Sequence, residues 1–176
     1  MENKNLAQIS SFAVNHDALL KGVYLSRLDS YRGCEVATFD IRMKLPNKGS
    51  YLDTATAHAI EHLGATYLRS LEGFSERVVY FGPMGCRTGF YLAIFGNEPV
   101  RAIGEVLVGM FAFIAGFEGK IPGQSPIECG NYLDLSLSGA KAEAESYLNV
   151  LSSLSEANTN YPPLEGGGIR NAYQRI

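Results

Sequence analysis

The chain has 176 residues, of which 46% are hydrophobic and 19% are charged, and its formal net charge is -3. This length and composition predict one folded domain, and so small a charge argues against nucleic acid and anionic membrane surfaces as partners. Residues 1–5 are polar and lack the basic segment followed by an apolar segment that marks a signal peptide. No apolar stretch approaches the roughly 20 residues that cross a bilayer, so we expect a cytoplasmic protein.

The chain has three cysteines, Cys34, Cys86 and Cys129, which is an odd number. Without a signal peptide, this count argues against a framework of disulfides. In a reducing compartment the thiols remain available as metal ligands or as catalytic groups. Each cysteine still needs its own argument, because cysteine is also a common small residue of protein cores.

The first predicted elements are a strand and a helix. Apolar and polar side chains alternate over residues 35–43, which predicts a half-buried strand that ends at the turn 46–49. Residues 54–71 carry an apolar stripe at helical spacing. Asp53 or Thr54 would cap this helix at its N-terminus.

A hairpin and a second helix are expected next. Residues 77–81 and 88–95 are typical of strands, and the segment between them, 82–85, of a turn. Asn97 would cap the second helix, with Pro99 tolerated in its first turn. The apolar stripe of that helix consists of Val100, Ile103, Leu107, Met110, Phe111 and Ile114.

The remaining elements complete one domain. A Gly/Pro-rich loop over 119–126 precedes a predicted strand over 131–137 and a last helix over 139–154. We expect residues 1–155 to form a single catalytic domain and 156–176 an irregular C-terminal tail. Strands joined by turns, with helices between them, predict an α+β fold in which a mainly antiparallel sheet packs against helices.

The motif with the clearest chemistry lies on the first, central helix and consists of His58, Glu61 and His62. Two histidines four residues apart on a helix project side by side and can bind one metal ion. The intervening glutamate lies on the same face, where it suits a general base. The order H-x-x-E-H also occurs in inverzincin peptidases, and such residues can also be ordinary polar groups of a helix.

A third metal ligand must come from another segment. The candidates are His16, Cys34, Cys86, Cys129 and scattered carboxylates. Cys129 stands where a loop enters a predicted strand, but spacing alone hardly separates it from Cys86. Two histidines and one cysteine would leave a coordination position open, as catalytic metals require.

Cys86 lies in the Gly-rich turn 82–89, next to Arg87 and within possible reach of Arg42. A nearby cation makes a thiolate available near neutral pH. An inert thiol in a turn explains the same residues equally well, so chemistry alone leaves the role of Cys86 open.

Three segments resemble the S-ribosylhomocysteine lyase (LuxS) family in order and approximate spacing: His58-x-x-Glu61-His62, Gly82 to Gly89, and Cys129 to Tyr132. Weaker agreement at Ser11 to His16 and at Thr38 to Arg42 extends the similarity from about residue 11 to 154. The resemblance implies cleavage of S-ribosylhomocysteine to homocysteine and dihydroxypentanedione by carbonyl migration and β-elimination. This reaction belongs to the methyl cycle and supplies the precursor of a quorum-sensing autoinducer.

The resemblance also implies roles for individual residues. The metal, natively Fe2+ with Zn2+ or Co2+ able to substitute, would be bound by His58, His62 and Cys129. The acid–base pair would be Glu61 and Cys86, with help from Arg42. The substrate would contact Ser11 and His16, and a carboxylate of the substrate would contact Arg69.

The family resemblance also implies a homodimer with active sites at the interface. Where many relatives have an acidic residue before the Gly-rich turn, this chain has Tyr80 and Phe81.

Other functions fit parts of the same pattern. In an inverzincin-type metallopeptidase, Glu143 or Glu145 would supply the third ligand and Cys86 would have no role. A deformylase-like hydrolase would need H-E-x-x-H and an earlier cysteine. A structural metal site would need a fourth protein ligand. Replacing Cys86 by Ala distinguishes the lyase from the peptidase.

Overall fold

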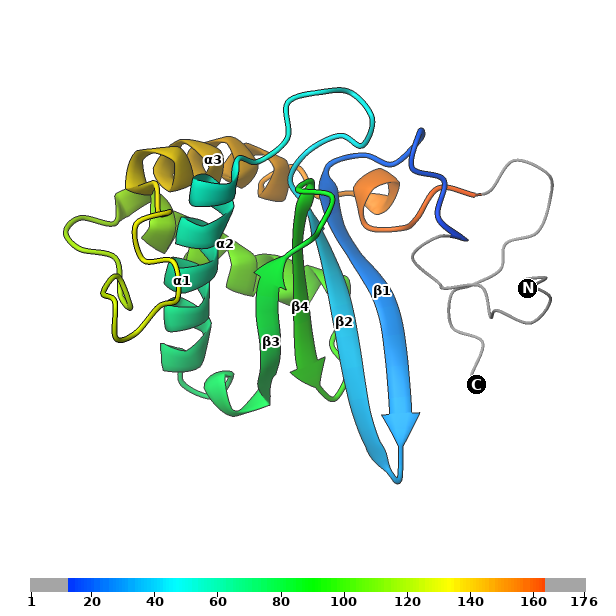
Figure 1. Cartoon of the computed structure of the whole chain (residues 1–176). Helices are drawn as coiled ribbons and strands as arrows, with labels where there is room; N and C mark the ends of the chain where they lie inside the picture. Colours follow the sequence, from blue (N-terminus) through cyan, green and yellow to red (C-terminus); the bar gives the residue numbers. More distant parts are fainter. Residues whose placement is uncertain (1–12, 164–176) are drawn as a thin grey trace, which may run out of the picture.

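The structure, a computed structural model, describes residues 13–163, so Ser11 lies outside the described residues. Within this range the chain forms one four-stranded sheet and three α-helices (Figure 1). The strands are β1 (Gly22–Tyr31), β2 (Cys34–Arg42), β3 (Val78–Pro83) and β4 (Gly89–Phe95). The helices are α1 (Thr54–Ser70), α2 (Val100–Gly116) and α3 (Leu137–Leu151). The predicted α+β class is confirmed.

The sheet has the order β1-β2-β4-β3, and all neighbouring strands are antiparallel. Alternate residues therefore point to opposite faces. Phe39 and Ile41 of β2 join the hydrophobic core with Phe90 and Leu92 of β4. Residues between them, such as Asp40, point to the other face.

The strand β1 has no counterpart among the elements expected from the sequence. Its first half is buried on both faces, so the alternation that marks a half-buried strand is missing. Arg32 and Gly33 join it to β2 and both have positive φ, 50° and 82°. Two such residues form the tight hairpin turn that matches the twist of antiparallel strands.

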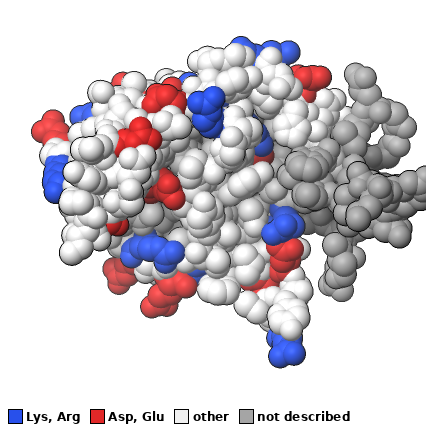
Figure 2. All heavy atoms as spheres, viewed as in Figure 1, with Lys and Arg blue, Asp and Glu red and all other residues white. Residues whose placement is uncertain are grey.

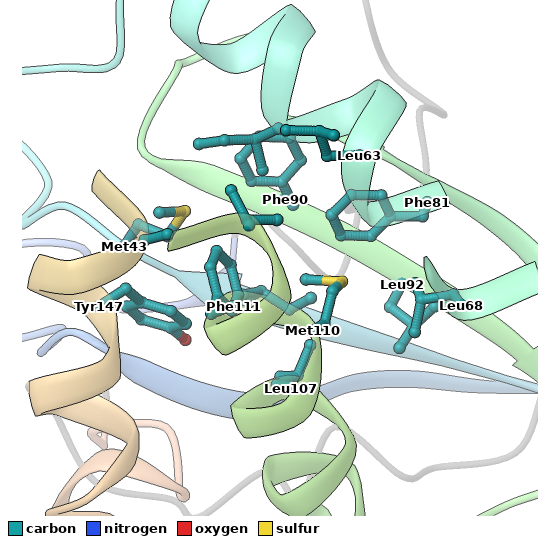
Figure 3. Close-up of a cluster of buried hydrophobic side chains, with 14 of the residues drawn as sticks. Met43, Leu63, Leu68, Phe81, Phe90, Leu92, Leu107, Met110, Phe111 and Tyr147 are labelled. Atoms are coloured by element: carbon teal, nitrogen blue, oxygen red, sulfur yellow. The ribbon is translucent and has the colours of Figure 1, made fainter. Parts of the chain in front are cut away.

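The core lies between one face of the sheet and the helices. Leu63 and Leu68 of α1 and Leu107 and Met110 of α2 meet Phe81 of β3 and its neighbours there (Figure 3). At Gly64 an added Cβ would lie 2.5 Å from the Phe81 ring, so α1 approaches β3 closely. This packing fixes the orientation of the helix that carries the histidine motif.

The helix α1 begins as predicted. The carboxylate of Asp53 accepts hydrogen bonds from the backbone N–H of Thr56 at 2.8 Å and from its hydroxyl at 2.8 Å. These bonds satisfy donors that the first turn leaves unpaired. They also lower the pKa of Asp53 below its ordinary value of 3.8, chiefly through the backbone donor.

Replacing Asp53 by Ala is expected to lower the free energy of unfolding by about 1 kcal/mol at pH 7, because the cap is lost. The folded-state pKa is depressed, so the ionic part of this contribution is complete above pH 3.8 and declines as the pH falls through the folded value. Urea unfolding at pH 7 and pH 3 measures both effects. Asp53→Asn is the matched control, since asparagine also caps; an equal loss in both variants would contradict the prediction.

The start of α2 differs from the prediction. The helix begins at Val100, and Pro99, not Asn97, occupies the N-cap position without a side-chain cap. The N–H groups of Ala102 and Ile103 bond to the Pro99 carbonyl. The residue before a proline is disfavoured in helical conformation, so the helix cannot extend back toward Asn97. All members of the predicted stripe except the terminal Val100 are buried.

The strand predicted over 131–137 is wrong. Residues 131–133 form a turn, 134–136 have no regular structure, and α3 begins at Leu137, where Ser136 caps it by accepting a bond from the Gly139 N–H. Their backbone groups bond elsewhere: the Ser136 N–H donates to the Ala55 carbonyl, and the Asp134 carbonyl accepts from His58. The alternation of Tyr132 and Asp134 with leucines therefore does not mark a strand. The backbone of this segment bonds to α1 and not to a neighbouring strand.

The face of the molecule seen in Figure 2 shows no concentration of one charge. Acidic and basic side chains are interspersed over the visible face (Figure 2). Several of them form ion pairs, including Lys44 with Glu143 and Arg77 with Glu98, both at 2.6 Å. Among residues 13–163, no helix is long and apolar enough to cross a membrane.

Candidate metal centre and active site

The histidine motif and Cys129 come together as one group. His58 and His62 lie one turn apart on α1 with ring centroids 4.7 Å apart. The Cys129 sulfur lies 3.4 Å from Nε2 of His58. One ligand atom from each residue lies within 4.8 Å of the other two. Tertiary structure thus brings Cys129, 67 residues after His62 in the chain, to the predicted site.

Backbone carbonyls orient both imidazole rings. Nδ1 of His58 lies 2.8 Å from the Asp134 carbonyl oxygen, and Nδ1 of His62 lies 2.7 Å from the Pro122 carbonyl oxygen. A carbonyl oxygen can only accept, so each Nδ1 carries the proton and each Nε2 has a free lone pair. Such outer partners fix the tautomer of metal-binding histidines. The amino-acid sequence does not reveal these partners, because a backbone carbonyl has no sequence signature.

A glycine allows the loop to reach His62. Gly123 has φ +75°, and an added Cβ would lie 3.0 Å from Nδ1 and 3.1 Å from Cε1 of that ring. The position needs a residue that tolerates positive φ and has no side chain. The Pro122 carbonyl can therefore lie against the ring.

Replacing Gly123 by Ala is expected to weaken Zn2+ or Co2+ binding by about 10-fold or more, because the methyl group pushes His62 from its carbonyl partner. Competition with a chromophoric chelator measures the affinity. Gly119→Ala is the matched control: its φ is also positive, +100°, but nothing lies within 4 Å of the added Cβ. Equal affinity in the two variants would rule out the contact as the cause.

Cys129 is held in a turn that offers its sulfur a donor. Its own N–H bonds to the Ser125 carbonyl at 3.0 Å, and the Asn131 N–H points at its sulfur at 3.4 Å. The thiolate is the form of cysteine that binds metal, and the Asn131 N–H can donate a hydrogen bond to it. Two imidazoles and one thiolate suit Fe2+, Zn2+ or Co2+ and leave a position for a non-protein ligand. The donor set therefore fits a catalytic divalent metal.

Glu61 lies beside these ligands, in a hollow of about 410 Å³. The hollow is lined by His58, Glu61, His62, Ala65, Thr66, Phe81, Pro122 and Gly123. Glu61 therefore lies where it can reach a molecule bound in the hollow. A carboxylate next to a metal site can exchange protons with such a molecule.

Cys86 and Arg42 form a second group, which does not line this hollow. Arg42 is buried, and its Nη1 donates to Thr88 Oγ1 at 2.5 Å. Thr88 Oγ1 lies 3.0 Å from the exposed Cys86 sulfur. Burial lowers the pKa of Arg42, but Asp40 and, to a smaller extent, Cys86 raise it, with a net increase. The guanidinium thus supplies a permanent positive charge near the thiol.

The proposed substrate residues have different positions. Nδ1 of His16 donates to the Val14 carbonyl at 2.9 Å. His16 is also close enough to Asp40 for its charge to lower the pKa of that carboxyl. Arg69 lies in the last turn of α1 and donates to the carbonyls of Val78 and Val79. Tyr80 and Phe81 stand where the family resemblance led us to expect an acidic residue. Of the two, Phe81 lines the hollow.

Comparison with known proteins agrees with this geometry. The family described as S-Ribosylhomocysteinase (LuxS) matches residues 9–158. The S-ribosylhomocysteine lyase of Clostridium beijerinckii is 48% identical over 158 residues, which are 89% of this chain and 99% of the relative. That of Finegoldia magna is 49% identical, covering 88% and 98%, and that of Desulfotalea psychrophila 46%, covering 89% and 99%. The chain belongs to the S-ribosylhomocysteinase family.

Proposed function

We propose that this protein is an S-ribosylhomocysteine lyase, a carbon–sulfur lyase that converts S-ribosylhomocysteine to homocysteine and dihydroxypentanedione. The observation that carries the proposal is the convergence of His58, His62 and Cys129 beside Glu61, in a chain of this family. The metallopeptidase alternative gains no support, because the three ligands already comprise a cysteine in place of the carboxylate it requires.

The proposed metal is Fe2+, for which Zn2+ or Co2+ can substitute, bound by His58, His62 and Cys129. When bound, it supplies positive charge that stabilises negative charge developing on substrate oxygens. The imidazoles are held by their backbone partners with Nε2 facing the site, so this chain offers the metal a fixed set of donors.

The chemistry requires proton transfers at several carbons. Two shifts move the carbonyl from the first to the third carbon of the ribosyl chain, and each removes a proton from one carbon and returns one to its neighbour. Removal of the proton at the fourth carbon then forms a double bond to the fifth, and homocysteine leaves as its thiolate. We assign these transfers to the Glu61 carboxylate and the Cys86 sulfur. Arg42 assists Cys86 through Thr88, to which it donates.

The substrate contacts and the assembly extend the proposal. Ser11 and His16 would contact the substrate, and Arg69 would bind a carboxylate of it. We propose a homodimer in which a partner subunit helps to complete each active site. Two observations support this: Cys86 does not line the hollow beside Glu61, and Tyr80 and Phe95 are exposed on the sheet face opposite the helical core.

The proposed location is the cytoplasm, where a free thiolate remains reduced. All three cysteines are free, and Cys34 and Cys86 are exposed. Exposed thiols persist in reducing compartments. There the lyase would recycle homocysteine in the methyl cycle and release the autoinducer precursor.

Anaerobic incubation of the Fe2+-loaded protein with S-ribosylhomocysteine tests the function. We expect one free homocysteine thiol per substrate consumed, measured with a thiol reagent after protein removal, together with a diketone trapped as a quinoxaline. The same preparation should not hydrolyse a quenched-fluorescence peptide library. Peptide hydrolysis without thiol release would reverse the assignment in favour of the peptidase.

Sedimentation equilibrium of the same sample tests the proposed homodimer. A monomer at the concentration used in the activity assay would contradict it.

A further inference from the structure

Tyr161 lies three residues after residue 158, where the match to the family ends. It nevertheless packs on the sheet. Its ring stacks on Tyr24 of β1 with centroids 4.8 Å apart and planes 6° apart. Its hydroxyl donates to Oδ2 of Asp40 at 2.9 Å. The segment after η3 (Glu156–Asn158) thus returns to the strands β1 and β2, near the upper end of β1 in Figure 1.

Asp40 is the centre of this contact. It is 1% exposed and Arg42 is 3% exposed, although both point to the sheet face away from the helical core. Asp40 accepts from Arg42 Nε at 3.1 Å and from Nη2 at 2.5 Å. A buried carboxylate needs such partners for its oxygens. Tyr161 provides the third hydrogen bond, on the same oxygen as Nη2.

The direction of the next bonds follows from donor chemistry. Arg42 has no acceptor, so Thr88 Oγ1 accepts from its Nη1. The proton of the Thr88 hydroxyl is then free to point at the Cys86 sulfur, 3.0 Å away, rather than at the Met84 sulfur, 4.0 Å away. Cys86 becomes the acceptor at the end of the series, and a thiolate accepts a hydrogen bond better than a thiol does.

We propose that Tyr161 is a positioning residue: its hydroxyl holds Asp40 so that Arg42 and Thr88 present a donor to the Cys86 thiolate. The proposal rests on the role that the proposed function gives to Cys86. Without the Tyr161 hydroxyl, Asp40 keeps only its two bonds from Arg42. Its oxygens then draw the guanidinium toward Asp40 and away from Thr88, so the donor to Cys86 is less well placed.

The protonation states identify Tyr161 as the donor in this contact. Burial, and then the charge of Asp40, raise the pKa of Tyr161 far above its ordinary value, so the hydroxyl keeps its proton and donates. Burial raises the pKa of Asp40, while Arg42 and then Tyr161 lower it. The titratable or charged groups that act on Asp40 or are acted on by it are Arg42, His16, Tyr24, Tyr91, Tyr147 and Tyr161.

Alkylation of Cys86 by iodoacetamide, measured against pH in the Zn2+-loaded protein without substrate, tests the proposal. Tryptic peptides separate the three cysteines, since Cys34 falls in 33–42, Cys86 in 78–87 and Cys129 in 121–141. Tyr161→Phe keeps the ring on Tyr24 and removes only the hydroxyl. We expect the midpoint of the Cys86 profile to rise by about half a pH unit or more. The profile of Cys34 in the same sample should stay unchanged.

Two comparisons separate positioning from a purely structural role. Tyr31→Phe, at the exposed tip of the β1–β2 hairpin, is the matched control and should leave the Cys86 profile in place. Loss of one buried hydrogen bond should lower the melting temperature of Tyr161→Phe by about 2 to 4 °C. A lowered melting temperature with a Cys86 profile equal to that of wild type would overturn the proposal.

A double variant tests whether the effect passes through Asp40. In an Asp40→Asn background, Tyr161→Phe should produce no further shift of the Cys86 midpoint, because the carboxylate that Tyr161 holds is gone. A full additional shift would contradict transmission through Asp40. Alkylation needs no turnover, so failure of lyase activity and failure of this proposal give different results.

Discussion

Replacing Glu61 by Gln is expected to lower kcat for S-ribosylhomocysteine cleavage by about 10²- to 10⁴-fold, the usual contribution of a general acid–base group. Glutamine has nearly the same size as glutamate and cannot take up a proton. The carboxylate lines the hollow beside His58 and His62, and it is not one of the three residues grouped as a possible metal site. The metal should therefore remain bound while the proton transfers fail, and release of homocysteine thiol measures the loss.

The control for this result is Glu145→Gln. Glu145 is exposed on α3 and is one of the carboxylates that a peptidase would need as a third ligand. We expect full lyase activity and an unchanged metal content in this variant. If Glu61→Gln retained more than a tenth of the wild-type kcat, Glu61 would not be the proton carrier. If Glu145→Gln lost its metal, the ligand set would be wrong.

Replacing Cys86 by Ala is expected to reduce lyase turnover to a similar extent, because the second proton carrier is removed. Cys86 lies in the β3–β4 turn, exposed and 3.0 Å from Thr88 Oγ1. Its turn is held by bonds that do not involve the sulfur, such as Arg87 N–H to the Met84 carbonyl at 2.8 Å. We therefore expect the fold and the metal content to be unchanged.

The matched control is Cys34→Ala, since Cys34 is the other exposed thiol and lies next to the tip of the β1–β2 hairpin. It should keep wild-type turnover. Metal analysis of both variants by atomic emission checks that neither change empties the site. Wild-type turnover in Cys86→Ala would remove the thiol from the mechanism and leave Glu61 as the only proton carrier.

Local spacing was sufficient where neighbours in the chain act together. His58, Glu61 and His62 share one face of α1 because residues three and four apart are aligned on any helix. Asp53 could be recognised as the cap because its partner, Thr56, is three residues away. The hairpin β3–β4 followed from its turn residues. The family resemblance supplied what spacing left open, namely that Cys129 joins the two histidines in a group that could hold a metal ion.

The sequence by itself determined the α+β class, the helix that carries His58, Glu61 and His62 on one face, and the family. Only the tertiary structure decided which carbonyls orient those histidines, that residues 131–136 form no strand beside α1, and that Tyr161 reaches Asp40. The physical reason is the separation along the chain between the groups that interact. A local pattern reports contacts within about one helical turn or a strand's alternation, whereas these bonds join groups 60 to 121 residues apart, and several use backbone atoms that every residue has.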